Sequence, residues 1–379
     1  MSQPPAAPPS LAFDPTKFVH PAQAGGIERY VIDDGAGRGI RALCVNTGGG
    51  LRYRLLPDRG LDVDQAYFGP HSLAFLSHRG PSAPAGGIER GIDWLGKFPG
   101  GLLTSCGPFG VGAPVTDAGE DLPLHGPHSN TPAEIESVVQ PDPHAGRLQM
   151  SVTGVLRYGR LFGPNVTLRR TVRSTLGANA IEVTDEFTNP GNTPAPHAWL
   201  LHINLGYPLV DAGATFCYRA RVEDGTVQPL PNPVARARFT PGGGDGGRSA
   251  GGGAVPDYKR VPPPLDAHRG AVEAVAYLTP KAGPDSQVTV GLVNDVLGLG
   301  LAIDYDPTAF PRCVNWQHWG PGEYVTALEP TNGSVEGRAT DRANGTLDSL
   351  PPRGSKTYRY TIRVVSDAVG LDALRTLNT

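Results

Sequence analysis

Apolar and polar residues alternate along RLQMSVTGVLRYGRLF (residues 147–162) and again along NVTLRRTVRSTLGANAIEVTDEFTNPG (residues 165–191). Both stretches are rich in β-branched residues and are divided by Gly, Pro or Asn, which is typical of strands joined by turns. The segment PHAWLLHINLGYPLV (residues 196–210) continues the series. We therefore predict that these stretches form consecutive antiparallel strands of one large sheet.

The same pattern extends to both ends of the chain. Near the N-terminus, ERYVIDD (residues 28–34) and IRALCVN (residues 40–46) flank a glycine-rich corner and predict a hairpin. Further strand candidates are VEAVAYLTP (272–280), QVTVGLVND (287–295), LGLAIDYD (299–306), YVTALEP (324–330) and SKTYRYTIRVVS (355–366). Only residues 88–98 and the C-terminal LDALRTLN (371–378) could hold a turn or two of helix. More than about fifteen strand candidates predict an all-β fold of large, stacked antiparallel sheets.

Composition agrees with this fold class and sets the expected domain limits. The 379 residues include 39 prolines and 51 glycines, which interrupt long helices. We expect a disordered N-terminal tail over residues 1–20 and a single sandwich domain over residues 21–379. The low-complexity stretch at residues 241–255 is interpreted as a flexible glycine-rich surface loop, because strand-like segments of the same kind lie on both sides of it.

Charge and cysteine usage exclude several classes of partner. The net charge is −3 and no basic run is present, so neither nucleic acid nor an anionic membrane is an expected partner. Cys44, Cys106, Cys217 and Cys313 are widely spaced, which argues against a metal site and a disulfide framework. We find no signal peptide and no apolar run long enough to span a membrane. The expected location is the cytoplasm, and the expected assembly is a monomer or homodimer.

Polar residues gather in three segments that are far apart in the sequence. LPLHGPHSNTPAEI (residues 122–135) holds His125 and Asn130, WLLHINLGYPL (199–209) holds His202, and YVTALEPTNG (324–333) holds Glu329. A histidine exchanges protons near neutral pH, and a partly buried glutamate can be shifted toward the same range. The three segments are expected to form one pocket. The structural alternatives are core histidines bonded to the backbone and a solvated turn carboxylate.

With these three segments and the motifs DRGLD (residues 58–62) and GGLLTSCG (residues 100–107), the chain resembles the aldose 1-epimerase (galactose mutarotase-like) superfamily, specifically its poorly characterised bacterial branch. The resemblance covers about three quarters of the chain and implies a β-supersandwich. It also implies an isomerase that interconverts sugar anomers by acid–base ring opening and closure, on a small-molecule sugar and with neither cofactor nor metal. By matching motifs, Glu329 would be the general base, His202 the general acid on the opposite side of the ring, and His125 a second histidine that binds the sugar and polarises its ring oxygen.

The sequence departs from the family pattern at the residues that bind the sugar hydroxyls in other members. The usual GRxANR arginine is absent, so Arg59 or Arg79 could replace it; Arg59 is expected in a turn with its guanidinium reaching outward. No aspartate has a clear match, although Asp266, Asp304 and Asp306 are nearby candidates. Asn130 could bind a hydroxyl or cap a turn. In NWQHWGPGEY (residues 315–324), Trp316 and Trp319 suggest an aromatic wall for the sugar, with a structural role expected for at least one of them. Gln317 and His318 lie between them, and alternation along a strand would bring only one of each neighbouring pair to the cleft. Trp316 and His318 are the two that we predict to bind the sugar.

Two further functions remain open at this point. One is a non-catalytic carbohydrate-binding or regulatory module, which would have no need of an acid–base trio. The other is a different sugar isomerase or lyase on the same fold. It stays open because the arginine and aspartate that hold the sugar in the family are missing.

Overall fold

The alternating region at residues 147–191 forms three long antiparallel strands. They are β10 (Gln149–Gly159), β11 (Asn165–Thr175) and β12 (Ala180–Thr188) in a computed structural model of the protein. The structure describes residues 13–85, 89–219, 222–223, 226–227, 234–237, 259–270, 272–278 and 280–378. Along β11, buried side chains alternate with more exposed ones, as the sequence pattern predicts.

These strands belong to an eight-stranded antiparallel sheet of the described chain. Its order is β15-β20-β21-β25-β12-β11-β10-β9. The remaining members are β9 (Glu134–Val139), β15 (Thr215–Tyr218), β20 (Val288–Asn294), β21 (Leu299–Tyr305) and β25 (Ser355–Val365). One end of its outer face is covered by helix α2 (Ala368–Arg375), whose Leu371 and Leu374 pack on Val293 and Ala302.

A second, six-stranded sheet of the described residues carries two of the three polar segments, those that hold His202 and Glu329. Its order is β18-β19-β22-β23-β14-β6. Its strands are β6 (Thr104–Cys106), β14 (Leu200–Leu205), β18 (Val234–Ala237), β19 (Val272–Leu278), β22 (Arg312–Gly320) and β23 (Glu323–Thr331). A five-stranded sheet lies nearby, with β1 (Gly26–Val31), β2 (Arg41–Asn46), β3 (Leu51–Leu56), β4 (Asp62–Phe68) and β5 (His71–Ser72) in chain order.

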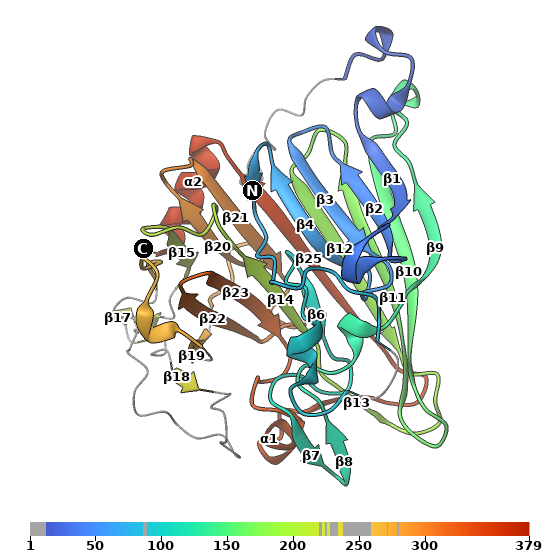
Figure 1. Ribbon diagram of the computed structural model, residues 1–379, viewed down its shortest axis with the longest axis vertical. Coiled ribbons are helices and arrows are strands. Elements are labelled where there is room, and N and C mark those ends of the chain that lie inside the picture. Colours follow the sequence, from blue (N-terminus) through green and yellow to red (C-terminus); the bar gives the residue numbers. More distant parts are fainter. Residues whose placement is uncertain are drawn as a thin grey trace.

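Smaller elements complete the described structure. Three two-stranded ribbons are β7 (Val115–Asp117) with β8 (Glu120–Leu122), β13 (Ala195–His197) with β24 (Asp348–Leu350), and β16 (Val222–Glu223) with β17 (Thr226–Val227). Short helices are α1 (Arg338–Ala343), η1 (Pro15–Lys17), η2 (Pro21–Gln23), η3 (Gly35–Gly37), η4 (Asp93–Lys97), η5 (His128–Asn130), η6 (Pro143–Ala145), η7 (Asp266–His268) and η8 (Thr376–Asn378). Figure 1 shows α2 and the β7–β8 ribbon with α1 at opposite ends of the stacked sheets.

The three large sheets share one hydrophobic core. Buried Leu43 on β2, Leu168 on β11 and Leu328 on β23 belong to the same cluster of packed apolar side chains. A separate cluster lies on the other face of the six-stranded sheet and includes Trp94, Leu200 and Val314. The prediction of an all-β fold of large, stacked antiparallel sheets is therefore confirmed, and the six-stranded sheet is covered on both faces.

Some sequence-based expectations fall outside what the structure describes. Residues 1–12 of the expected tail and all of residues 241–255 lie outside the described residues. Residues 13–20 are described and include η1. The helical turn expected within residues 88–98 is present as the 3-10 helix η4, whereas residue 88 is not among those described. The division into a tail and a single domain stays a prediction. Among the described residues, no helix combines the length and the apolar character needed to cross a membrane.

Candidate active site

His202 and Glu329 meet across two neighbouring strands of the six-stranded sheet. β14 and β23 pair with Leu200 opposite Thr331 and Ile203 opposite Leu328, a register that places His202 opposite Glu329. Directly opposite residues on an antiparallel ladder have adjacent side chains. His202 Nε2 lies 3.1 Å from Glu329 Oε1. The two side chains are buried, with only 7% and 2% of their surface exposed. When His202 is protonated, the pair is a buried salt bridge.

Strand alternation assigns the two faces of the six-stranded sheet. On β14, Leu201 and Ile203 enter the main core, so His202 between them faces the opposite side. β14 is buried along its whole length because both faces are covered, which explains why LLHINL shows no simple alternation of hydrophobicity. On β22, Trp316 and His318 share the face of His202, whereas Trp319 is fully buried in the main core.

His125 reaches the same face from the loop between β8 and η5. Its backbone is left-handed, with φ 59°, and is held by bonds from Gly107 N–H to its carbonyl (2.9 Å) and from its own N–H to the Gly112 carbonyl (3.0 Å). The Gly112 N–H also donates to Nδ1 of the ring (3.3 Å). A neutral His125 therefore carries its proton on Nε2 and can donate a hydrogen bond from there. The His125 and His202 rings are 5.6 Å apart, edge to face.

Aromatic side chains surround this trio. Trp94 on η4 stacks on Phe98, with ring centroids 4.7 Å apart, and packs 4.6 Å from the His125 ring. Trp316 meets the His202 ring edge to face at 5.5 Å. The Trp316 indole N–H donates to Glu273 Oε2 (2.6 Å), which fixes the plane of the ring. The site thus combines proton-exchanging groups with flat apolar walls.

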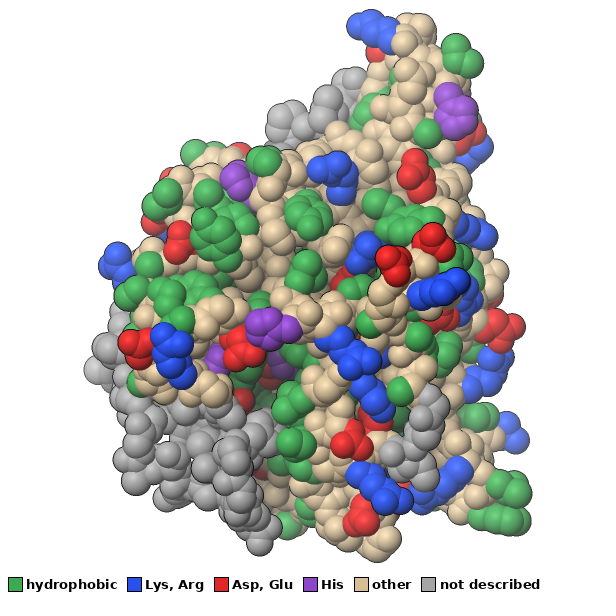
Figure 2. Space-filling view, in the orientation of Figure 1, with side chains coloured by type: hydrophobic (Ala, Val, Ile, Leu, Met, Phe, Trp, Pro, Cys, Tyr) green, Lys and Arg blue, Asp and Glu red, His purple; other side chains and the backbone are tan. Residues whose placement is uncertain are grey.

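The trio and the aromatic walls line one large cavity. Its volume is about 930 Å³, near the upper end of the range of about 300–1,000 Å³ for small-molecule pockets. Figure 2 shows the hollow on the molecular surface, with histidine and acidic side chains at its edge. Of the residues predicted from the sequence, six line it, namely Arg79, His125, His202, Trp316, His318 and Glu329.

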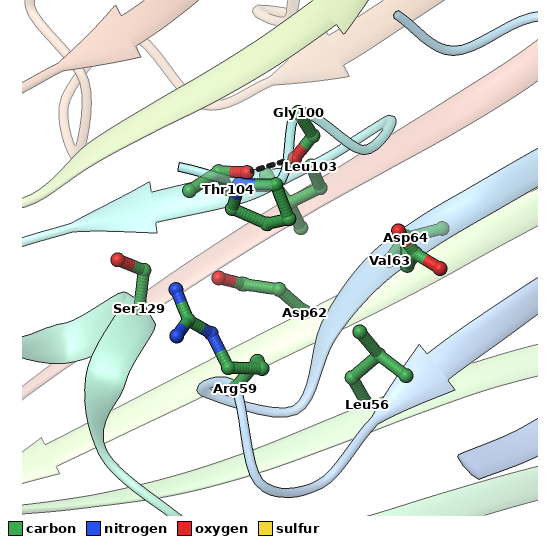
Figure 3. Close-up of a pocket in the computed structure, with 10 residues that line it drawn as sticks. Leu56, Arg59, Asp62, Val63, Asp64, Gly100, Leu103, Thr104 and Ser129 are labelled. Atoms are coloured by element: carbon green, nitrogen blue, oxygen red, sulfur yellow. Dashed lines mark hydrogen bonds between the residues drawn. The ribbon is translucent and has the colours of Figure 1, made fainter. Parts of the chain in front are cut away.

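The structure does not bring Arg59 and Asn130 to the cavity lining. The prediction that the Arg59 guanidinium reaches outward is wrong. The residue is only 2% exposed, because loops fold over the turn that carries it. The guanidinium donates to Asn130 Oδ1 (3.2 Å) and to the Lys97 carbonyl (2.7 Å). Figure 3 shows Arg59 beside Ser129 in a separate, water-sized cavity of about 10 Å³. Arg59 and Asn130 therefore join the loops that carry Trp94 and His125.

Sequence reasoning missed Trp94, Phe98 and Glu273. Trp94 and Phe98 lie four residues apart in IERGIDWLGKF, the spacing that brings side chains together on a helical turn, so a signal was present. Glu273 occupies an ordinary alternating strand, and no local pattern distinguishes it. The sequence also left open which aspartate holds sugar hydroxyls. The acidic side chains that line the cavity in the described structure are instead glutamates: Glu273, Glu323 and Glu329.

A buried polar network lies directly behind the site. The Asp62 carboxylate accepts from both the N–H (2.9 Å) and the hydroxyl (2.8 Å) of Ser105 on β6, the strand that pairs with the His202 segment. Arg170 on β11 joins Asp62 to Asp185. Burial opposes the charge on Asp62, yet the nearby His128 and Arg170 lower the pKa of its carboxyl. The DRGLD and TSCG motifs are thus in contact, through Asp62 and Ser105, next to β14.

The described residues hold no group of three or more His, Cys, Asp or Glu side chains arranged to bind a metal. Cys44, Cys106, Cys217 and Cys313 are all free thiols. Burial raises the pKa of the Cys313 thiol to about 12, which leaves it protonated near neutral pH. The titratable groups that line the cavity are therefore histidines, glutamates and one arginine.

Comparisons with known proteins agree with this architecture. The sequence matches the family described as "Domain of unknown function (DUF4432)" over residues 37–236 and 248–364. No curated protein matches the sequence. Among solved structures, a Klebsiella pneumoniae protein provisionally named an aldose 1-epimerase is similar with a TM-score of 0.75 and 20% identity, covering 94% of this chain and 89% of that one.

Two further structures share the architecture at lower similarity. The Slr1438 protein of Synechocystis has a TM-score of 0.58 and 14% identity, covering 89% of this chain and 100% of its own. A galactose mutarotase-like protein of Clostridium acetobutylicum has a TM-score of 0.57 and 10% identity, covering 90% of this chain and 98% of its own. The fold is that of the galactose mutarotase-like β-sandwiches, and at these identities the likeness concerns the fold alone.

Proposed function

The chain belongs to the DUF4432 family, and we propose that it is an aldose 1-epimerase-like isomerase, which interconverts sugar anomers by opening and reclosing the ring. The observation that carries the proposal is the contact of 3.1 Å between His202 Nε2 and Glu329 Oε1, buried in an aromatic-walled cavity with His125 beside it. Such a pair supplies a proton acceptor and a proton donor at one place.

The reaction needs a proton removed from the anomeric hydroxyl and a proton given to the ring oxygen. Glu329 accepts the first and His202 donates the second, so that the bond between the anomeric carbon and the ring oxygen breaks and an aldehyde forms. Rotation and the reverse transfers then close the ring to the other anomer. Acid and base were predicted to lie on opposite sides of the ring, but in the structure the two side chains are in contact. Adjacent groups suffice because both sugar oxygens are bonded to the same carbon.

His125 and the aromatic rings supply positioning. The Nε2–H of neutral His125 offers a hydrogen bond to the ring oxygen, which polarises the bond that breaks. Trp94, Phe98 and Trp316 provide flat faces on which the apolar C–H side of a sugar stacks. Arg79 and His318 line the same cavity and are available to bind hydroxyls of the substrate away from its anomeric carbon. In this proposal Arg59 and Asn130 act indirectly, by holding the loops around the cavity.

The proposal is tested by anomer exchange measured by NMR on a panel of aldoses, as acceleration over buffer alone. Acceleration for at least one sugar supports it. Sugar binding without acceleration would favour the carbohydrate-binding module, and conversion to a different product would favour another isomerase or a lyase. The cytoplasmic location and the monomeric or dimeric state stay predictions.

We expect His125→Asn to raise KM roughly 2–10-fold and to lower kcat as well, since one neutral hydrogen bond to the sugar contributes about 0.5–1.5 kcal/mol. Asparagine suits this position because it tolerates the left-handed backbone, and its side-chain oxygen can accept from Gly112 N–H. Michaelis–Menten analysis of the exchange rate checks this. An unchanged KM would remove His125 from sugar binding.

Treatment with EDTA is expected to leave the rate of anomer exchange unchanged. In the proposed mechanism His202 and Glu329 carry the protons, so no Lewis acid is required. The measurement is the exchange rate before and after dialysis against chelator. Activity lost in EDTA and restored by zinc, calcium or manganese would contradict the mechanism.

A further inference from the structure

The cavity extends well beyond the groups that the proposed reaction uses. Ring opening involves only the anomeric hydroxyl and the ring oxygen, and the trio that serves them is buried: His125 and His202 are 5% exposed and Glu329 is 2% exposed. A volume of about 930 Å³ suits a drug-sized ligand and is far more than one pyranose ring fills. The volume that one ring leaves unfilled can hold a further part of the substrate.

The outer part of the cavity is lined by a second set of polar side chains. This outer region comprises His78, Arg79, His318 and Glu323. The Glu323 side chain is 48% exposed and that of His78 is 78% exposed, so the region lies at the mouth. Glu323 Oε1 contacts His78 Nε2 at 3.2 Å, and Glu323 Oε2 lies 3.7 Å from His318 Nε2. Figure 2 shows side chains coloured as histidine and as acidic residues at the edge of the hollow.

A continuous floor connects the inner and outer regions. Trp316 and His318 are next-but-one residues on β22, so their side chains emerge on the same face about 6.6 Å apart. Their rings are nearly parallel, with 13° between the planes and 6.4 Å between centroids. Trp316 touches His202 at the inner end, and His318 lies beside Glu323 at the outer end. Two flat rings in succession can seat two sugar rings in succession.

The chemistry of the outer region fits a neutral, hydroxyl-rich group. Histidine nitrogens and a carboxylate supply donors and acceptors at short range, and the Arg79 guanidinium adds further donors. Exposed Ile92 and Leu95 lie on the same lining and offer apolar contact. Carbohydrates present hydroxyl edges and apolar faces together, which this combination matches.

We propose that the outer region is a second sugar subsite and that the substrate is a reducing disaccharide, or the reducing end of a longer glycan. The reducing ring lies at His125, His202 and Glu329, and the glycosidically linked ring lies over His318 near Glu323 and Arg79. This assignment of substrate class rests on the proposed anomerase activity. The subsite itself is a binding property that can be measured without catalysis.

The test compares monosaccharides with reducing disaccharides that have the same reducing ring. Glucose is compared with maltose, cellobiose and lactose, and galactose and mannose with disaccharides ending in those sugars. Exchange rates come from NMR on the wild type, and dissociation constants come from calorimetry on the same protein. For at least one pair, we expect the disaccharide to exceed its monosaccharide by at least about tenfold in both kcat/KM and affinity.

Variants of the outer region then locate the preference. His318→Ala and Arg79→Ala are each expected to reduce the ratio of disaccharide to monosaccharide affinity at least about threefold, the loss of one or two hydrogen bonds. Arg359→Ala is the matched control, because Arg359 is an exposed arginine on β25, in the eight-stranded sheet and outside the cavity lining. It should leave the ratio as it is.

The outcomes separate the two proposals. If no sugar is accelerated but a disaccharide binds about tenfold tighter than its monosaccharide, the subsite stands and the anomerase activity falls. If monosaccharides are exchanged and bound as well as every disaccharide, the subsite is overturned and the activity stands. A disaccharide preference that survives both outer variants would overturn the placement of the second ring, and so would a failure of both sugar classes to bind.

Discussion

Glu329→Gln is expected to lower the acceleration of anomer exchange by about 10²–10⁴-fold, the usual effect of removing a general base. The amide keeps the shape of the side chain, and its oxygen can still accept from His202 Nε2–H at the position that Glu329 Oε1 occupies. It cannot take up the proton of the anomeric hydroxyl. The loss should therefore appear in kcat far more than in KM. NMR exchange rates, corrected for the spontaneous reaction in buffer, give both constants.

The control for this experiment is Glu182→Gln, which makes the same chemical change on the exposed face of β12, outside the cavity. His202→Asn should show a loss similar to that of Glu329→Gln, and the double variant should lose little more, because the two groups act in one proton-transfer cycle. Retention of more than about a tenth of the wild-type acceleration by Glu329→Gln would show that another group is the base. Glu134 is then a poor substitute, since it lies outside the cavity lining and pairs with Arg157. Glu273 and Glu323, which line the cavity, would be the next candidates for the general base.

Much of the fold follows from local patterns in the sequence. The alternating stretches at residues 147–191 became β10, β11 and β12, because a strand with one face in a core must place apolar residues at every second position. The same rule predicts that only one of each neighbouring pair on β22 faces the cleft, and the structure places Trp316 and His318 there and Trp319 in the main core. These features depend on neighbours within one strand, which is why a single sequence can reveal them.

The site depends on relations that no local pattern records. His202 and Glu329 are in contact because of the register between β14 and β23, and register between strands so distant in the chain is set by the whole sheet. The resemblance to a known family supplied that pairing, whereas composition and spacing alone did not. Arg59 was misplaced for the same reason: the sequence shows a turn, and only the tertiary structure shows the loops that bury it.

Arg170→Met is expected to destabilise the folded protein by about 3–5 kcal/mol, the usual cost of removing one partner from a buried charge network. Arg170 is fully buried and donates to Asp185 at 2.7 and 2.9 Å and to Asp62 at 2.5 Å. Methionine fills much of the space but leaves two carboxylates without their cation. Urea denaturation followed by circular dichroism and tryptophan fluorescence measures the change in the free energy of unfolding.

Its neighbour Arg169 provides the matched control. Arg169 lies on the opposite, solvent-exposed face of β11 and pairs with Glu136 and Glu186. Exposed ion pairs contribute about 0–1 kcal/mol, so Arg169→Met should cost no more than that. An equal effect of the two substitutions would mean that the buried network does not stabilise the fold.

The cost of Arg170→Met should also depend on pH, with a sign that follows from the buried carboxyls. In the wild type the pKa of Asp62 is held below its usual value of 3.8, so its contribution is fully present above that pH and is lost only as the pH falls below it. In the variant, Asp62 stays buried but loses its cation, which raises the pKa of its carboxyl. The folded state then takes up a proton more readily than the unfolded chain. The difference in stability between the two proteins should therefore shrink as the pH is lowered from about 8 to about 5. A difference that stays constant or grows over this range would show that the lost stability comes from packing around the methionine and not from uncompensated charge.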